Sequence, residues 1–276
     1  MNTIQADARS TGRRAAHSPA FELLARLGFV ARGVIYATIG LLAIQVAIHS
    51  SNEKTNQRGA MQSIEEQPFG HWLLVAVAVG LGGYALWRFV QAFFGHGPEG
   101  GGDSSKMGRV VATASGVSYA VMCALAVAIL LGSASQSSSS SPHTSAAGVL
   151  GWPGGQWIVG AAGAIFIAVA LYQGYKGLSR KFLEEDKTDQ MGPATRRWIT
   201  AIGVVGHLAR MVAFGLIGVF IVRAALDYAP KKAVGLDGAL SKLAHQTYGT
   251  ALLFVVAAGL VAFGVYSIAD ARYRRI

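Results

Sequence analysis

The sequence predicts an all-α, polytopic membrane protein with six transmembrane helices, arranged as three tandem parallel two-helix repeats. Three observations support this class. Only 14% of the 276 residues are charged and 52% are hydrophobic, whereas about a quarter of the residues of a soluble domain are charged. Six apolar stretches each approach the ~20 residues that cross a bilayer. The motifs of the first two stretches then return further along the chain.

The charged residues lie in narrow bands, and the apolar stretches lie between these bands. Residues 1–20 are polar and are expected to form a disordered cytoplasmic tail. The repeats are expected at 21–96, 107–182 and 199–274, and the middle one is the most divergent. The stretches themselves are placed at about 27–48, 70–94, 109–131, 155–178, 199–226 and 247–270.

The first helix of the outer two repeats carries an arginine inside its basic end. When the first repeat is superposed on the third, Arg32 falls on Arg210, whereas the middle repeat has Ser115 at that position. Glycines recur at equivalent positions, and small residues let membrane helices approach closely. The glycines expected to support packing or turns are Gly28, Gly33, Gly40, Gly70, Gly80, Gly206, Gly218, Gly249 and Gly259.

The loop inside each hairpin also repeats, and the match is sharpest between the outer two copies. Apolar residues three to four positions apart predict a short amphipathic helix on the outer interface. A turn then leads into the second membrane helix. The residues that define this loop motif are Gly59, Gln67, Pro68, Gly238 and Gln246. In the middle repeat, the serine run from Ser133 to Ser145 carries no charge and is expected to be a flexible linker.

Lys and Arg are distributed unevenly between the two sides of the membrane. The tail, the second and fourth loops and the C-terminus hold 14 of the 24, whereas the other loops hold 5. The positive-inside rule therefore predicts a multipass protein of the bacterial inner (plasma) membrane with both termini in the cytoplasm. A pI near 9.9 then reflects topology, so no nucleic-acid partner is expected. Two helices per repeat give successive repeats the same orientation and predict an approximate three-fold axis along the membrane normal.

These motifs resemble a bacterial membrane family, the domain of unknown function 1206. The resemblance rests on the residues at 28–36 (Gly-Phe-Val-Ala-Arg-Gly-Val-Ile-Tyr), 59–61 (Gly-Ala-Met), 67–70 (Gln-Pro-Phe-Gly) and 84–88 (Tyr-Ala-Leu-Trp-Arg). It covers nearly everything from about residue 20 to residue 274. The resemblance implies tandem pairs of membrane helices. It supplies no activity and no cofactor.

Three arginines within the apolar stretches are candidate lipid or anion ligands. Arg32 and Arg210 occupy equivalent positions and could together hold an anionic headgroup or solute. The alternative is that each lies one to two turns inside the boundary and extends its side chain to the interface as an anchor. Arg88 fits the anchor interpretation at the cytoplasmic end of its own helix.

The sequence lacks the patterns that indicate catalysis or a metal site. It contains no Gly-x-Ser-x-Gly, no phosphate-binding loop, no His-Glu-x-x-His and no Cys-x-x-Cys, which argues against an enzyme. All 14 Asp and Glu residues lie in tails, loops or helix ends, and ion-coupled transport usually needs buried carboxylates. No catalytic, cofactor-binding or metal-binding residue is therefore predicted.

The sequence favours a non-catalytic scaffold or accessory component embedded in the lipid bilayer. Its expected partners are anionic lipids, another membrane protein or a second copy of the chain. The alternative is a carrier or channel for a small solute or anion along the pseudo-three-fold axis. A carrier needs a polar axis, whereas a scaffold should have a dry, glycine-packed one.

Overall fold

The computed structural model describes residues 19–49, 57–94, 106–132, 142–244, 246 and 248–275. Within these ranges the regular structure is helical, apart from an isolated bridge between Asp186 and Arg274. The predicted tail lies outside the described residues up to residue 18, as do residues 133–141 of the serine run. Residues 19–20 of the predicted tail and residues 142–145 of the predicted linker are instead helical, at the starts of α2 and α6. Among the described residues, six helices are long and apolar enough to cross a membrane: α2 (Pro19–His49), α4 (Gly70–Phe94), α5 (Lys106–Leu130), α7 (Gly155–Leu178), α8 (Pro193–Leu226) and α10 (Gly249–Tyr273). The predicted all-α, six-span class is confirmed.

The helices of the loops are short. They are α3 (Gln57–Glu65), α6 (Pro142–Leu150) and α9 (Leu236–Ala244), with the 3-10 turns η3 (Lys181–Glu185), η4 (Thr188–Gln190) and η5 (Pro230–Lys232). The apolar residues of α3 and α9 are turned inward, and Met61 and Leu240 are fully buried. Helices α3 and α9 therefore each pack their apolar face on the bundle.

Helix α8 begins before the start expected from hydropathy, at Pro193 rather than near residue 199. Residues 194–198 include Arg196 and Arg197 and are too polar to count as a span, but they contain no helix breaker after Pro193. Proline suits the first turn of a helix, where its missing N–H leaves no bond unmade. The helix therefore continues outward past the apolar segment.

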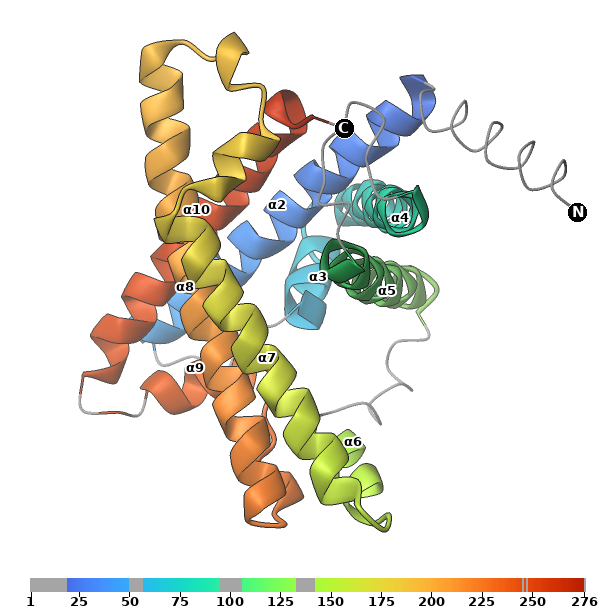
Figure 1. Cartoon of the computed structure of the whole chain (residues 1–276), viewed down its shortest axis with the longest axis vertical. Helices are drawn as coiled ribbons and strands as arrows, with labels where there is room; N and C mark the ends of the chain where they lie inside the picture. The colour runs from blue at the N-terminus through green and yellow to red at the C-terminus, as the bar shows by residue number, and fades with distance from the viewer. Residues whose placement is uncertain are drawn as a thin grey trace, which may run out of the picture.

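The six long helices pack side by side in the order α7, α8, α10, α2, α4, α5. Spans that follow one another along the chain pack together, and α10 packs on α2, as in a ring. Within the described residues, however, α5 and α7 form no packed interface with each other. The α4/α5 pair is seen nearly end-on in Figure 1, whereas α7 and α8 run close to the plane of the view, so the two pairs diverge. The expected three-fold arrangement is therefore open at one place, inside the middle repeat.

Glycine explains why the outer two hairpins close. A Cβ at Gly28 or Gly80 would lie less than 3.0 Å from the facing helix of the first hairpin. The same holds at Gly206 and Gly259 in the third hairpin. These crossings bring the two backbones together, which only glycine permits.

The middle hairpin has β-branched residues at the same two positions. Val111 stands where the outer repeats have Gly28 and Gly206, and it is 46% exposed. Ile165 stands where they have Gly80 and Gly259, and it is 63% exposed. Their branched side chains prevent the close approach, so α5 packs only on α4 and α7 only on α8 among the spans described. Both are the least buried of the six spans.

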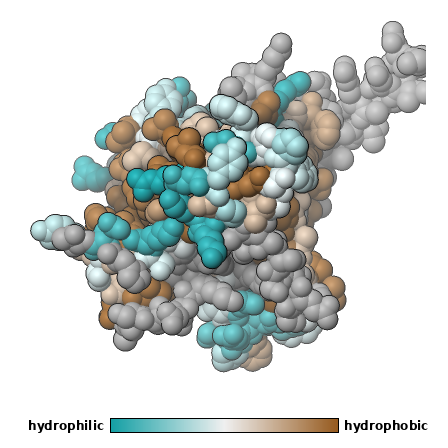
Figure 2. Space-filling view, turned by 90° about the horizontal axis from the view of Figure 1, so that it is seen from below, coloured by the Kyte–Doolittle hydropathy of each residue, from teal (hydrophilic) through white to brown (hydrophobic). Residues whose placement is uncertain are grey.

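The start of α2 and the end of α10 lie at the same end of the molecule (Figure 1). An even number of spans requires this arrangement. The opposite end, which carries α6, is seen from below in Figure 2, where hydrophilic residues gather near the middle with hydrophobic residues beside them. Which end faces the cytoplasm remains a prediction from the charge distribution.

Candidate functional site

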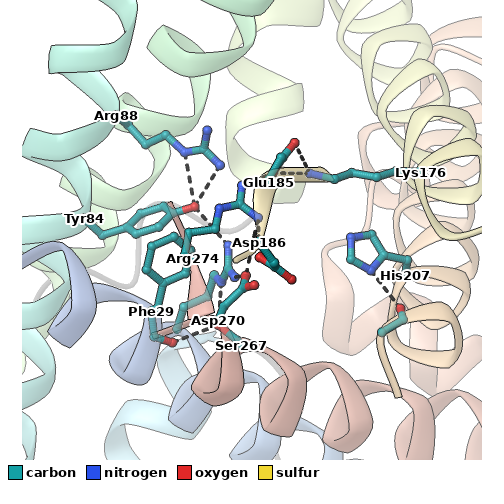
Figure 3. A network of polar contacts seen from close by, with 12 residues as sticks. Phe29, Tyr84, Arg88, Lys176, Glu185, Asp186, His207, Ser267, Asp270 and Arg274 are labelled. Atoms are coloured by element: carbon teal, nitrogen blue, oxygen red, sulfur yellow. Dashed lines mark hydrogen bonds and ion pairs between the residues drawn. The ribbon is translucent and has the colours of Figure 1, made fainter. Parts of the chain in front are cut away.

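A buried cluster of charged and polar side chains lies between α2, α4 and α10, near the C-terminal end of α10 (Figure 3). At its centre is Arg32, which is 6% exposed. Its Nε donates to Ser267 Oγ at 2.7 Å, and its two terminal nitrogens donate to Tyr84 Oη at 2.9 Å and to Asp270 Oδ2 at 3.0 Å. Ser267 Oγ in turn donates to the carbonyl oxygen of Phe29 at 2.8 Å. One guanidinium therefore joins three helices.

Tyr84 connects this arginine to a second one. Arg88 donates from Nη2 to Tyr84 Oη at 2.8 Å and from Nη1 to Gln91 Oε1 at 3.0 Å. Its guanidinium also lies 4.9 Å from the ring of Trp87, a favourable cation–π distance. The Tyr84 hydroxyl therefore accepts from two guanidinium groups at once, which concentrates positive charge around it.

The connection between α7 and α8 folds back over this cluster. The Lys187 N–H donates to the Tyr273 carbonyl at 2.7 Å, and the Arg275 N–H donates to the Glu185 carbonyl at 3.1 Å. Glu185 also pairs with Arg274, and it accepts from Lys176 Nζ at 2.8 Å. These contacts attach the end of α10 to the loop.

Two carboxyl groups meet where this loop packs on α10. Asp186 is 1% exposed and Asp270 is 2% exposed. Burial, together with the charge of Asp270, raises the pKa of Asp186 to about 9. Each carboxyl has one buried oxygen, Oδ1, without a hydrogen-bond donor among the described groups. A protonated Asp186 carries an O–H group that can donate a hydrogen bond to Asp270.

Arg210 makes the equivalent contact in the third repeat. With the Gln173 amide oriented so that its oxygen faces the guanidinium, Arg210 donates to it at 2.9 and 3.0 Å. The guanidinium stacks 4.4 Å from the ring centre of Phe263, and Arg32 lies 5.3 Å from the same ring. Phe263 therefore lies close to both guanidinium groups.

The repeat relates these contacts to one another. Arg88, Gln173 and Ser267 occupy the same position in the three successive repeats. Ser267 faces Arg32 across the α10/α2 crossing, and Gln173 faces Arg210 across the α7/α8 crossing. At the α4/α5 crossing the arginine is instead Arg88 on α4, and α5 has a serine at the position of Arg32. By sequence position, each pair of helices that joins two repeats therefore includes one arginine, although the printed contacts of Arg88 are with its own helix α4.

The structure places Arg32 differently from the anchor interpretation. Its side chain turns into the bundle because Asp270, Ser267 and Tyr84 offer three acceptors there. Arg210 and Arg88 are partly buried, and both are bound by neighbouring side chains rather than extended along the helix.

The predicted glycines lie at crossings and turns. Besides the hairpin contacts, Gly33 and Gly40 face α10, and Gly218 faces α7. Gly70 and Gly249 follow the short helices, where a Cβ would collide with the last carbonyl groups of α3 and α9.

The loop motif gives the same turn in the outer repeats. The N–H groups of Gly70 and Gly249 donate to the carbonyls of Gln67 and Gln246, both at 2.7 Å. Pro68 is exposed in this turn, and Gly59 is buried in α3. Gly238, in α9, packs against Val234, which precedes that helix.

The sequence did not point to Asp270, Ser267, Gln173 or Asp186 as partners of the arginines. The repeat pattern contained a signal, since Ser267, Gln173 and Arg88 share one position that faces the arginine position of the next repeat. Among the described residues, no three His, Cys, Asp or Glu side chains gather in a way that could hold a metal ion.

A second feature is a surface groove of about 1100 Å³ between the α7–α8 connection and the start of α8. Its lining includes Arg180, Arg196 and Arg197, with apolar residues of α8 further along. None of the described residues that line the groove belongs to the buried cluster.

The family described as Domain of Unknown Function (DUF1206) matches residues 27–95, 110–180 and 205–274. The chain belongs to the DUF1206 family. The resemblance inferred from the motifs is thereby confirmed. The DUF1206 repeat thus corresponds to one hairpin of this fold, and the crossings that carry the arginines are contacts between DUF1206 repeats.

A similar protein is found in Bacillus subtilis (strain 168), where it is described as uncharacterized protein YxxB. It is 32% identical over 261 residues, which cover 94% of this chain and 93% of that protein. No solved structure matches this chain.

Proposed function

We propose that this DUF1206 protein is a non-catalytic membrane scaffold, and that its middle repeat binds a transmembrane helix of a partner membrane protein. The observation that carries the proposal is the opening of the helix ring between α5 and α7. At the two equivalent places in the ring, a helix packs against a helix. A partner helix between α5 and α7 would complete the ring.

Exposed apolar side chains on α5 and α7 support a helix as the occupant. Val121 on α5 and Ile165 on α7 are 64% and 63% exposed and carry no charge. In a membrane, helices associate through close packing of small residues against larger ones. Because Val121 and Ile165 are bulky and β-branched, the complementary partner is a helix with glycine, alanine or serine on one side.

The packed interior supports a scaffold rather than a carrier. The N–H groups of Arg32 already donate to Ser267, Tyr84 and Asp270. The crossings of α2 with α4 and α10 are glycine-packed at Gly28, Gly33 and Gly40. A guanidinium with protein acceptors in place needs no solute to compensate its charge.

A carrier is the second candidate, and one observation favours it. The Arg32–Asp270 ion pair lies within candidate membrane spans, and ionisable groups in such positions often mark a solute or ion pathway. If the protein is a carrier, proteoliposomes should show anion flux that Arg32→Gln abolishes. The scaffold proposal predicts no difference in flux between protein-free liposomes, the wild type and Arg32→Gln.

Site-specific photo-crosslinking in the native membrane tests the proposal. A photoreactive residue replaces Ile165 or Val121 in the middle repeat, or the similarly exposed Val255 on α10 as a matched control. The proposal predicts that Ile165 and Val121 give an adduct with the same protein and that Val255 does not. An adduct of twice the chain mass would instead identify a second copy, and lipid adducts alone at all three positions would contradict partner binding.

A further inference from the structure

The groove beside the start of α8 lies where the chain leaves the membrane. Helix α8 has 34 residues and is therefore about 51 Å long at ~1.5 Å per residue. This exceeds the roughly 30 Å of a hydrocarbon core. Trp198 near its start is 71% exposed, as is typical of a side chain at the membrane interface. The first turns of α8 therefore lie at the level of the headgroups.

Three arginines line this groove. Arg180, Arg196 and Arg197 are exposed, and none of them takes part in an ion pair within the described part of the chain. Of the described residues that line the groove, Glu184 alone is acidic. The groove thus has an excess of positive charge. Arginine is suited to phosphate because its planar guanidinium can donate two parallel hydrogen bonds.

The groove continues onto an apolar surface. Ala201, Val204 and Val205 line its far part, one to three turns along α8 from the arginines. Val205 is 50% exposed on a candidate membrane span. A ligand that fills the groove therefore meets cationic groups at one end and hydrocarbon at the other.

We infer that this groove binds the phosphate headgroup of an anionic phospholipid. The phosphate lies against Arg180, Arg196 and Arg197, and one acyl chain runs along Val204 and Val205. A free phosphate ion would use the arginines alone, whereas the apolar wall gives the acyl chain a place. The site is independent of the partner surface on α5 and α7, so either proposal can fail without the other.

Native mass spectrometry of the purified full chain in detergent tests the site. Phosphatidylglycerol and phosphatidylcholine are titrated separately against the wild type and against Arg180→Gln/Arg196→Gln/Arg197→Gln. The site predicts that phosphatidylglycerol binds the wild type more tightly than phosphatidylcholine, and that the triple variant binds phosphatidylglycerol at least about tenfold more weakly. The affinity of the wild type should also fall as ionic strength rises.

A matched variant removes the same charge elsewhere. Lys231→Gln/Lys232→Gln/Arg272→Gln neutralises three exposed cations and should bind phosphatidylglycerol like the wild type. If both triple variants lose affinity equally, binding reflects net charge and the site is wrong. If excess inorganic phosphate displaces the lipid fully, the groove takes a free anion and the lipid proposal is overturned.

A single charge reversal provides a second variant that leaves the other arginines in place. Arg196→Glu should weaken phosphatidylglycerol binding and leave phosphatidylcholine binding unchanged. Its thermal unfolding should match the wild type because Arg196 is exposed. Unchanged phosphatidylglycerol binding by this variant would contradict the assignment.

Discussion

Arg32 on α2 and Asp270 on α10 form an ion pair of 3.0 Å that joins the first repeat to the third. Both residues are almost completely buried. The contact belongs to a recurring sequence pattern in which each pair of helices that joins two repeats includes one arginine. The hairpins themselves are closed by glycine in the outer repeats, and the middle hairpin, which lacks those glycines, stays open. Polar contacts thus join neighbouring repeats, and close glycine packing holds each outer hairpin together.

Removing Arg32 should destabilise the protein strongly. Arg32→Met leaves Asp270 buried with a weaker partner, Arg274 at 3.8 Å, and breaking a buried pair costs roughly 3–5 kcal/mol. The free energy of unfolding in detergent should fall accordingly, and adding Asp270→Leu should recover most of the loss. Arg272→Gln, at an exposed position, serves as the control. Additive losses in the double variant would show that the two residues are not coupled.

A side chain at Gly28 should separate α2 from α4. In Gly28→Val the new Cβ would collide with Tyr84, and overpacking of this kind costs about 1–3 kcal/mol. Gly148→Ala is the matched control, because among the described atoms nothing lies within 4 Å of its Cβ position. Thermal unfolding should show a loss for Gly28→Val and none for Gly148→Ala. Equal behaviour of the two variants would refute close packing at this crossing.

The stability of the protein should fall as the pH rises. The pKa of Asp186 is raised to about 9 in the folded chain from a usual value of 3.8, so between these values the folded state holds a proton that the unfolded state has lost. Stability from this group is therefore fully present below about pH 4 and declines up to pH 9. Unfolding midpoints measured from pH 5 to pH 9 should be flatter for Asp186→Asn than for the wild type. Parallel profiles would place the proton elsewhere.

The arginine at the α4/α5 crossing should be exchangeable between its two helices. Arg88→Ser alone removes two donors from Tyr84 and one from Gln91. Adding Ser115→Arg restores an arginine from the side used by the other two repeats. The double variant should therefore unfold at a higher temperature than Arg88→Ser. A double variant less stable than the single one would show that the crossings are not equivalent.

Much of the fold could be predicted because membrane spans and repeats leave strong patterns in one sequence. Hydropathy located the six spans, and apolar spacing located the short helices α3 and α9. The opening between α5 and α7 was not predicted, although its cause is visible in the sequence. Val111 and Ile165 stand at glycine positions, but their effect depends on which helix faces them.

The candidate site could be predicted only in part. The repeat identified Arg32 and Arg210, but their burial depends on Ser267, Asp270 and Gln173 from other repeats. Asp270 lies near a helix end and therefore resembles an interfacial residue in the sequence. It is buried because the α7–α8 loop, which contains Asp186, folds over it. No local sequence pattern predicts that this loop packs on the end of α10.

The distance between α5 and α7 tests the central claim most directly. Spin labels are attached by cysteine substitution of Val121 and Ile158 in a Cys123→Ala background, and pulsed electron resonance measures their separation in lipid nanodiscs. Labels at Leu216 and Leu252, which hold the same positions of the third repeat, provide the matched pair. The structure predicts a clearly longer distance in the middle repeat than in the third. Equal distances would mean that the middle hairpin is closed, and the proposed partner surface would not exist.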